Sequence, residues 1–291
     1  MGADLFASDA HFTELVSVAS NALKTDLRKI CLRGPDRELT RTEFLQPLMV
    51  AVSLGYARKL ISERGVEPHI VLGHSLGEIS ALTVAEALSD EQAVLLAVER
   101  GRLMALDAAK SNGGMMAVIS NDRARVFDTL SELLKNGTVY LANDNSPVQN
   151  LLSGTVADLE EASWRLSAVA GVTCKKLPVA GAWHSPLMQE ARDGLARYLE
   201  TLSFKTPRMP ILMNVSAEPE TDPERIRALL LRNLTEPARW RSSMERLKTM
   251  DANTLFEIGP GRVLSGLARA NGFGGEIQIV NVNNLNRLMR V

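Results

Sequence analysis

The segment HIVLGHSLGEISALTVAEAL, residues 69–88, decides the fold class. It opens with a short apolar run after Pro68 that ends in glycine, which predicts a buried strand over His69–Gly73. The residues that follow, Leu76–Leu88, are rich in helix formers and contain no proline, which predicts a helix. A strand, a glycine-bounded turn and a helix in succession indicate an α/β protein with a parallel-sheet core.

The turn in this segment, Gly73–Gly77, matches the GxSxG pattern of a nucleophile elbow. In such an elbow, small neighbours let a sharp turn hold the Ser75 hydroxyl exposed, and the amide of Leu76 points at a developing oxyanion. Serine needs a base to take its proton, and histidine is the usual one. His184 lies in a loop-like segment, where functional side chains are often carried, and is the candidate base. We expect His74 to point elsewhere and to make a supporting hydrogen bond.

Apolar residues recur at helical spacing over Phe12–Leu23 and Phe44–Ile61, which predicts two helices. A third helix is predicted over Asp90–Ala109, with Ser89 or Asp90 as its cap. The charged stretch between the first two, residues 32–43, is interpreted as a loop. Farther along the chain, short apolar runs predict strands in MPILMNVS and TLFEI, each followed by a helix.

The middle of the chain has a different pattern of predicted secondary structure. Four β-like runs, MMAVIS, VYLAND, QNLLSG and CKKLPV, alternate with helical stretches around Ala124–Leu134 and Val156–Val169. The order strand, helix, strand, strand, helix, strand is typical of a ferredoxin-like unit. We therefore predict a hydrolase-like α/β domain formed by residues 1–111 and 179–291, with an inserted ferredoxin-like subdomain at 112–178.

Composition excludes several function classes. The formal net charge is −1, so the protein as a whole has no positive charge that would attract nucleic acid or anionic lipid. Only Cys31 and Cys174 are present, which argues against a disulfide framework or a structural zinc site. The N-terminus lacks a signal-peptide pattern, and no apolar run is long enough to span a bilayer. We expect a cytoplasmic monomer that binds neither membrane nor nucleic acid.

Five ordered motifs carry a resemblance to a known family: GHSLGE (73–78), ERGRLM (99–104), GAWHSPLM (181–188), NLTEPARW (233–240) and EIGPGRVLSGL (257–267). In order and spacing they resemble the malonyl-CoA:acyl carrier protein transacylases, a family that includes the acyltransferase domains of polyketide synthases. The likeness runs from about Met1 to Ala270. Fatty-acid synthesis, polyketide synthesis and malonate decarboxylation all use such proteins.

The resemblance implies transfer of a malonyl group from coenzyme A to the phosphopantetheine thiol of an acyl carrier protein. It assigns Ser75 as the nucleophile, His184 as the base and then acid, and a backbone carbonyl near Asn233 as the group that orients the imidazole. Leu76 would supply an oxyanion-hole amide. Malonyl-CoA enters as a substrate, and no cofactor or metal is implied.

Substrate selection is the second implication. Arg100 matches the family arginine that grips the free malonyl carboxylate, and a guanidinium suits that task because it pairs bidentately and stays charged when buried. Acetyl-CoA is then expected to be a poor substrate. His74 and Trp183 also stand at positions expected to line the substrate site. Trp183 departs from the Phe that is common before the histidine.

One family feature is not found. Relatives begin with a strand and a Gly-Gln-Gly-Ser-Gln loop, whose first Gln supplies the second oxyanion-hole amide, and the segment Met1–Leu5 aligns just after that loop. Losing one such donor typically lowers turnover by ~10²–10³. We expect reduced activity from this sequence, and higher activity once upstream residues supply the loop.

Two other functions stay open at this point. A non-catalytic module that binds a carrier protein fits the absence of that loop. A thioesterase or other α/β hydrolase needs an Asp or Glu between the serine and the histidine, and Asp144 and Glu160 lie in that interval. For the carrier partner, residues 232–291 hold more Lys and Arg than Asp and Glu, and we expect Arg239 and Arg241 to face an acidic carrier.

Overall fold

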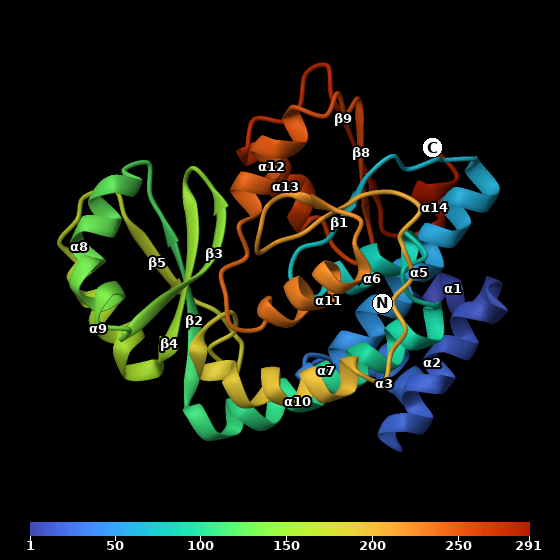
Figure 1. Ribbon diagram of the computed structural model, residues 1–291, viewed down its shortest axis with the longest axis horizontal. Coiled ribbons are helices and arrows are strands. Elements are labelled where there is room, and N and C mark those ends of the chain that lie inside the picture. The colour runs from blue at the N-terminus through green and yellow to red at the C-terminus, as the bar shows by residue number, and fades with distance from the viewer.

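A computed structural model describes residues 1–291 as a large lobe that carries both termini and a small lobe to one side (Figure 1). Its mixed helices and sheets form the predicted α/β fold. Three helices pack together at the centre of the large lobe: α2 (Ala10–Leu23), α5 (Thr42–Arg64) and α7 (Asp90–Ser111). All three were predicted from the sequence. α2 and α7 each turn an apolar face into one buried cluster, whereas α5 is buried on most of its sides.

The first parallel pair is shorter than the sequence suggested, whereas the strand predicted over TLFEI has the predicted extent. β1 (Val71–Leu72) pairs in parallel with β6 (Ile211–Leu212), and β7 (Pro219–Glu220) adds an antiparallel edge. β8 (Thr254–Ile258) and β9 (Gln278–Val282) form a separate parallel pair. The prediction of one buried strand over His69–Gly73 was therefore wrong in extent, because β1 has a single neighbour and is only half buried.

The helix after the elbow, α6 (Gly77–Val84), is also shorter than predicted. It stops before Leu88 because Glu86 adopts a left-handed conformation, with φ of 64°, and turns the chain. Ser89 then begins α7 with a capping box, in which its hydroxyl accepts from the Gln92 N–H and the Gln92 side chain accepts from the Ser89 N–H.

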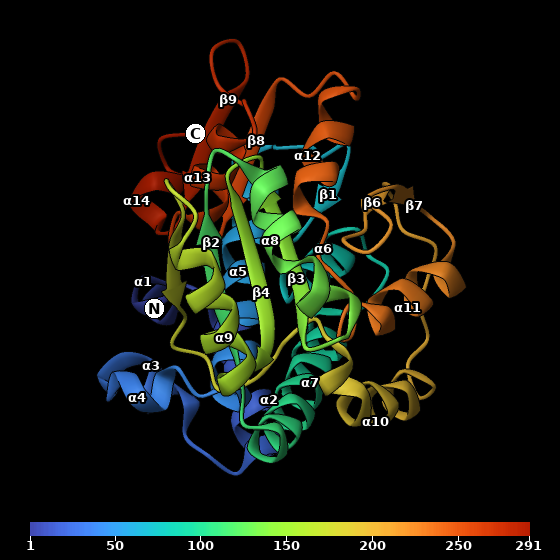
Figure 2. The same cartoon turned by 90° about the vertical axis from the view of Figure 1, so that its left-hand side faces the viewer.

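The small lobe is an antiparallel sheet covered on its outer face by two helices (Figure 2). The strand order β3-β4-β2-β5 is that of the predicted ferredoxin-like unit. The apolar faces of both helices close over the sheet. In chain order the elements are β2 (Gly113–Ile119), α8 (Arg123–Lys135), β3 (Val139–Ser146), β4 (Gln149–Thr155), α9 (Val156–Ser167) and β5 (Thr173–Lys176).

Backbone hydrogen bonds at β3 join the small lobe to the large one. Asn143 of β3 bridges to Ala238 of the large lobe, with hydrogen bonds from the Ala238 N–H to the Ala142 carbonyl and from the Asp144 N–H to the Ala238 carbonyl. After β5 the chain returns to the large lobe through the segment that holds His184. The junction of the lobes therefore lies next to that histidine.

The stretch 32–43, predicted as a loop, is partly helical. It contains the end of α3 (Leu27–Arg33) and all of α4 (Asp36–Leu39). The sequence reading missed Asp26, whose carboxylate caps α3 by accepting from the Lys29 N–H. None of the helices is both long and apolar enough to cross a membrane. The remaining helices are α1 (Ala3–Ser8), η1 (Pro186–Met188), α10 (Gln189–Leu199), α11 (Pro223–Arg232), α12 (Trp240–Lys248), α13 (Val263–Ala270) and α14 (Leu285–Leu288).

Candidate active site

Ser75 stands on a strained turn between β1 and α6. Its φ of 53° lies in the left-handed region, which a residue with a side chain adopts only when its surroundings hold it there. Gly73 makes the turn possible, because a Cβ at that position would lie 1.9 Å from the backbone carbon of Gly77. The Asn214 amide pins the turn: its Oδ1 accepts from the Ser75 N–H at 2.8 Å, and its Nδ2 donates to the Gly73 carbonyl at 2.7 Å.

His184 reaches this serine from the segment in which the chain returns to the large lobe after β5. Its Nε2 lies 2.8 Å from the Ser75 Oγ, and its Nδ1 lies 2.6 Å from the backbone oxygen of Asn233. A carbonyl only accepts, so Nδ1 carries the proton and Nε2 is free to accept from the serine hydroxyl. This is the tautomer that a base acting on Ser75 requires.

Burial keeps this imidazole neutral. The His184 side chain is 4% exposed, and burial lowers its pKa to about 3, with the nearby Arg100 cation acting in the same direction. At neutral pH the ring is therefore unprotonated at Nε2. A proton taken from Ser75 would create a buried cation, which the surrounding groups have to stabilise.

Arg100 of α7 places a buried cation beside the serine. It is 3% exposed, its Nη1 donates to the Gln46 Oε1 at 2.8 Å, and its Nη2 lies 3.4 Å from the Ser75 Oγ. Burial lowers its pKa to about 10, while the charge of Glu78 raises it, so the group stays protonated at neutral pH. The guanidinium forms no ion pair within the chain, and it therefore retains capacity to bind an incoming carboxylate.

The other predicted site residues are placed around this group. The Leu76 N–H, at the start of α6, has no acceptor within the chain. His74 points away from Ser75, bonds through Nε2 to the Asn145 Oδ1 at 2.8 Å and packs on Trp240. The Trp183 ring lies over Gly181, so close that a Cβ there would be 2.3 Å from it. The Trp183 side chain packs against the buried apolar cluster of the large lobe.

Sequence reasoning missed three supporting residues. Gln46, Glu78 and Asn214 each hydrogen-bond to a member of the serine, histidine and arginine group or to its backbone support. The sequence did carry a signal for Glu78. A carboxylate inside a short apolar helix is expected to be buried, and a buried carboxylate needs hydrogen-bond partners. Gln46 and Asn214 carried none, since each depends on long-range folding.

The two candidate acids of a hydrolase triad do not reach His184. Asp144 forms ion pairs with Arg123 and Arg241. Glu160 is an exposed residue of α9. The hydrogen bond at Nδ1 goes instead to a backbone carbonyl, so the arrangement is a serine and histidine pair without a carboxylate partner on the ring.

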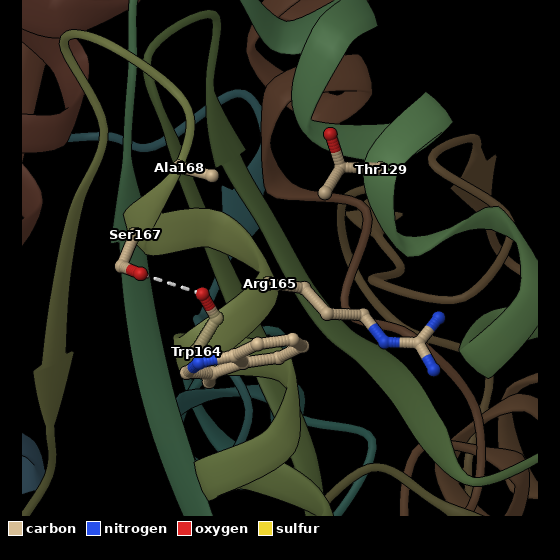
Figure 3. A pocket seen from close by; sticks show the side chains of 5 residues that line it. All are labelled: Thr129, Trp164, Arg165, Ser167 and Ala168. Atoms are coloured by element: carbon tan, nitrogen blue, oxygen red, sulfur yellow. Dashed lines mark hydrogen bonds between the residues drawn. The ribbon is translucent and has the colours of Figure 1, made fainter.

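A surface pocket elsewhere is separate from this group. Figure 3 shows it on the small lobe, between α8 and α9, with the Trp164 ring at its edge. It contains none of the residues described above. Its lining residues are Thr129, Trp164, Arg165, Ser167 and Ala168.

Known proteins with similar sequences are acyltransferases. Residues 1–270 match the acyl transferase domain family. The malonyl CoA-acyl carrier protein transacylases of Escherichia coli K12 and Salmonella typhimurium are each 34% identical over 269 residues, covering 92% of this chain and 87% of the relative. A polyketide biosynthesis malonyl CoA-acyl carrier protein transacylase of Bacillus subtilis is 35% identical, covering 92% of this chain and 90% of that relative.

Solved structures lead to the same family. A malonyl-transacylase in complex with its type II polyketide synthase acyl-carrier protein has a TM-score of 0.91 at 33% identity, covering 99% of this chain and 93% of that chain. The transacylase of Xanthomonas oryzae has a TM-score of 0.92 at 30% identity, covering 100% and 92%. The chain therefore belongs to the malonyl-CoA:acyl carrier protein transacylase family of acyltransferases.

Proposed function

We propose that this protein transfers a malonyl group from malonyl-CoA to the phosphopantetheine thiol of an acyl carrier protein, through an ester on Ser75. The observation that carries the proposal is the meeting of three groups at one point: the half-buried Ser75 hydroxyl, the neutral His184 ring at 2.8 Å and the Arg100 cation at 3.4 Å. A nucleophile with its base, next to an anchor for a carboxylate, suits an acidic acyl substrate.

In the first half-reaction the Ser75 Oγ attacks the thioester carbon while His184 Nε2 takes its proton. The negative charge that develops on the carbonyl oxygen is stabilised by the unengaged Leu76 N–H, at the positive end of α6. The carbon–sulfur bond then breaks, and the departing coenzyme A sulfur takes the proton from His184. The product is malonyl-Ser75.

In the second half-reaction the carrier supplies the nucleophile. Its phosphopantetheine thiol gives its proton to His184, the sulfur attacks the ester carbon, and the Ser75 oxygen leaves and recovers that proton. Atoms and charges balance without metal or redox chemistry. The same base serves both halves because the carbonyl of Asn233 holds the ring in one orientation throughout.

Arg100 explains preference for malonyl over acetyl groups. The malonyl carboxylate would pair with a guanidinium that has no other ion-pair partner, whereas an acetyl group would leave that buried cation unpaired. The same pairing holds the acyl group in the site between the two half-reactions. It therefore favours transfer to a carrier thiol.

Two carrier forms provide the test. The protein is incubated with malonyl-CoA and either holo-carrier, which bears phosphopantetheine, or apo-carrier, which does not, and the mass of the carrier is followed. We expect a gain of one malonyl group on the holo form alone. Release of free malonate at the same rate with and without holo-carrier would contradict transfer and indicate a hydrolase.

A further inference from the structure

A closed loop of hydrogen bonds runs from the Ser75 hydroxyl back to the Ser75 backbone. Ser75 Oγ contacts His184 Nε2, and His184 Nδ1 contacts the Asn233 carbonyl. The side-chain amide of Asn233 donates to the Glu78 Oε2 at 2.8 Å, and the Asn214 N–H donates to the Glu78 Oε1. The Asn214 Oδ1 completes the loop by accepting from the Ser75 N–H.

Glu78 is the one ionisable member of this loop that the reaction steps do not use. Its residue is 0% exposed, and both carboxylate oxygens accept from N–H donors. Both contacts match a carboxylate, whose oxygens only accept. The geometry therefore suits the ionised form, although burial opposes it and raises its pKa to about 8.

We propose that Glu78 is a positioning residue for acylation, which as a carboxylate holds Asn233 and Asn214 in place and supplies negative charge against the imidazolium that forms on His184. This inference rests on the proposed function, since it concerns the same reaction. The link to His184 runs through Asn233, whose amide and carbonyl belong to the same residue. Glu78 touches neither the ring nor the serine, so it acts through its two asparagine partners.

The charges around the loop fix the direction of the effect. Arg100 on α7 is the cation whose field reaches both Glu78 and His184. His74 also lies near the His184 ring, but burial lowers its pKa, so it is neutral at pH 7 and above. The Arg100 charge disfavours an imidazolium, whereas ionised Glu78 favours it. Acylation should therefore speed up as Glu78 loses its proton. Arg100 stays charged in that range, because its pKa is about 10.

The test is the pH profile of single-turnover acylation, read as malonyl-CoA consumed by enzyme without carrier. Wild type should rise about tenfold between pH 6 and pH 9, the difference between a neutral and a charge-assisted hydrogen bond. Glu78→Gln should show the low rate at every pH, with the KM for malonyl-CoA within about twofold of wild type. A Glu78→Gln variant that keeps the wild-type rise would overturn the inference.

Asp107→Asn is the matched control. Asp107 is also a buried carboxylate that accepts a backbone N–H, from Ala191 at 2.7 Å, but it has no bond to the loop. It should keep the wild-type profile, and a flattened profile there would show that any buried carboxylate has the same effect and refute a specific role for Glu78.

A second variant decides the question if Glu78→Gln does not fold. Asn233→Ala removes the amide that contacts Glu78 and leaves the carbonyl that orients His184. It should weaken the rise with pH, and an unchanged rise would overturn the inference. If wild type forms no acyl-enzyme at any pH, the proposed function fails first, and this inference fails with it.

Discussion

The Nδ1 of His184 donates to the backbone oxygen of Asn233 at 2.6 Å, in the place where many serine enzymes have a carboxylate. A carbonyl fixes the same tautomer but carries no full charge. The Glu78 carboxyl group accepts from the Asn233 side chain and so lies one residue removed from the ring. In the role proposed for Glu78, orientation and charge balance come from two different groups.

Gly73 and Gly77 of the elbow should differ sharply in how well they tolerate substitution by alanine. Gly73→Ala would press its Cβ into the Gly77 backbone, and we expect a loss of about 3 kcal/mol or more in the free energy of unfolding, together with loss of activity. Gly77→Ala is the control, because nothing lies within 4 Å of its Cβ position, and a change within about 1 kcal/mol is expected. Urea unfolding measures both, and equal losses would contradict this account of the turn.

Removing the Arg100 cation should change substrate preference more than general activity. For Arg100→Ala we expect kcat/KM for malonyl-CoA to fall about a hundredfold or more, because a buried pair in the substrate complex is lost. The value for acetyl-CoA should stay the same or rise. Parallel acylation assays with the two thioesters measure this, and an equal fall for both would assign Arg100 a structural role.

The buried neutral His184 should make the fold sensitive to acid. Its pKa is about 3 in the folded state and near its ordinary 6.5 in the unfolded chain, so below pH 6.5 the unfolded chain binds a proton that the folded site does not. The stability from this group is present above pH 6.5 and is lost as the pH falls toward 3.

His184→Gln removes that sensitivity while His74 remains in both proteins. Between pH 7 and pH 5, wild type should lose about 2 kcal/mol more of its free energy of unfolding than the variant. Denaturant titrations at both pH values measure the difference. Equal losses in the two proteins would mean that His184 is not held neutral by burial.

Carrier docking is expected at the rim of the site, where Arg239 lies. This arginine is exposed and forms no ion pair. Its backbone N–H donates to the carbonyl of Asn214, the residue whose side chain supports the Ser75 turn. The predicted partner residue Arg241 is less suitable than the sequence suggested, because it bonds to Asp144 and Glu245.

Arg239→Glu should raise the KM for an acidic holo-carrier about tenfold and leave the KM for malonyl-CoA unchanged. Arg290→Glu, an exposed charge reversal near the C-terminus, is the control and should leave both values unchanged. Steady-state transfer assays at low salt give all four constants. A parallel rise in the KM for malonyl-CoA would argue against docking at Arg239.

Local sequence patterns predicted much of the fold. The helices predicted over Phe12–Leu23 and Asp90–Ala109 end within two residues of the observed α2 and α7 at each end. The GxSxG pattern placed Ser75 on its turn, since the constraint there lies within five consecutive residues. The family resemblance brought Ser75 and His184 together, which no local pattern could have done.

The parts that were not predicted depend on long-range contacts. Glu78 meets Asn214 and Asn233 across sequence separations of 136 and 155 residues. Neither asparagine stands in a pattern that names its partner. The extent of β1 was likewise wrong, because strand length depends on which neighbours pair with it and not on its own apolar run.

The most direct test of the central claim is the intact mass of the protein after incubation with malonyl-CoA alone, followed by peptide mapping. We predict one added malonyl group, located on Ser75 in wild type and absent from Ser75→Ala. An unmodified wild type, or a malonyl group that persists in Ser75→Ala, would contradict the account.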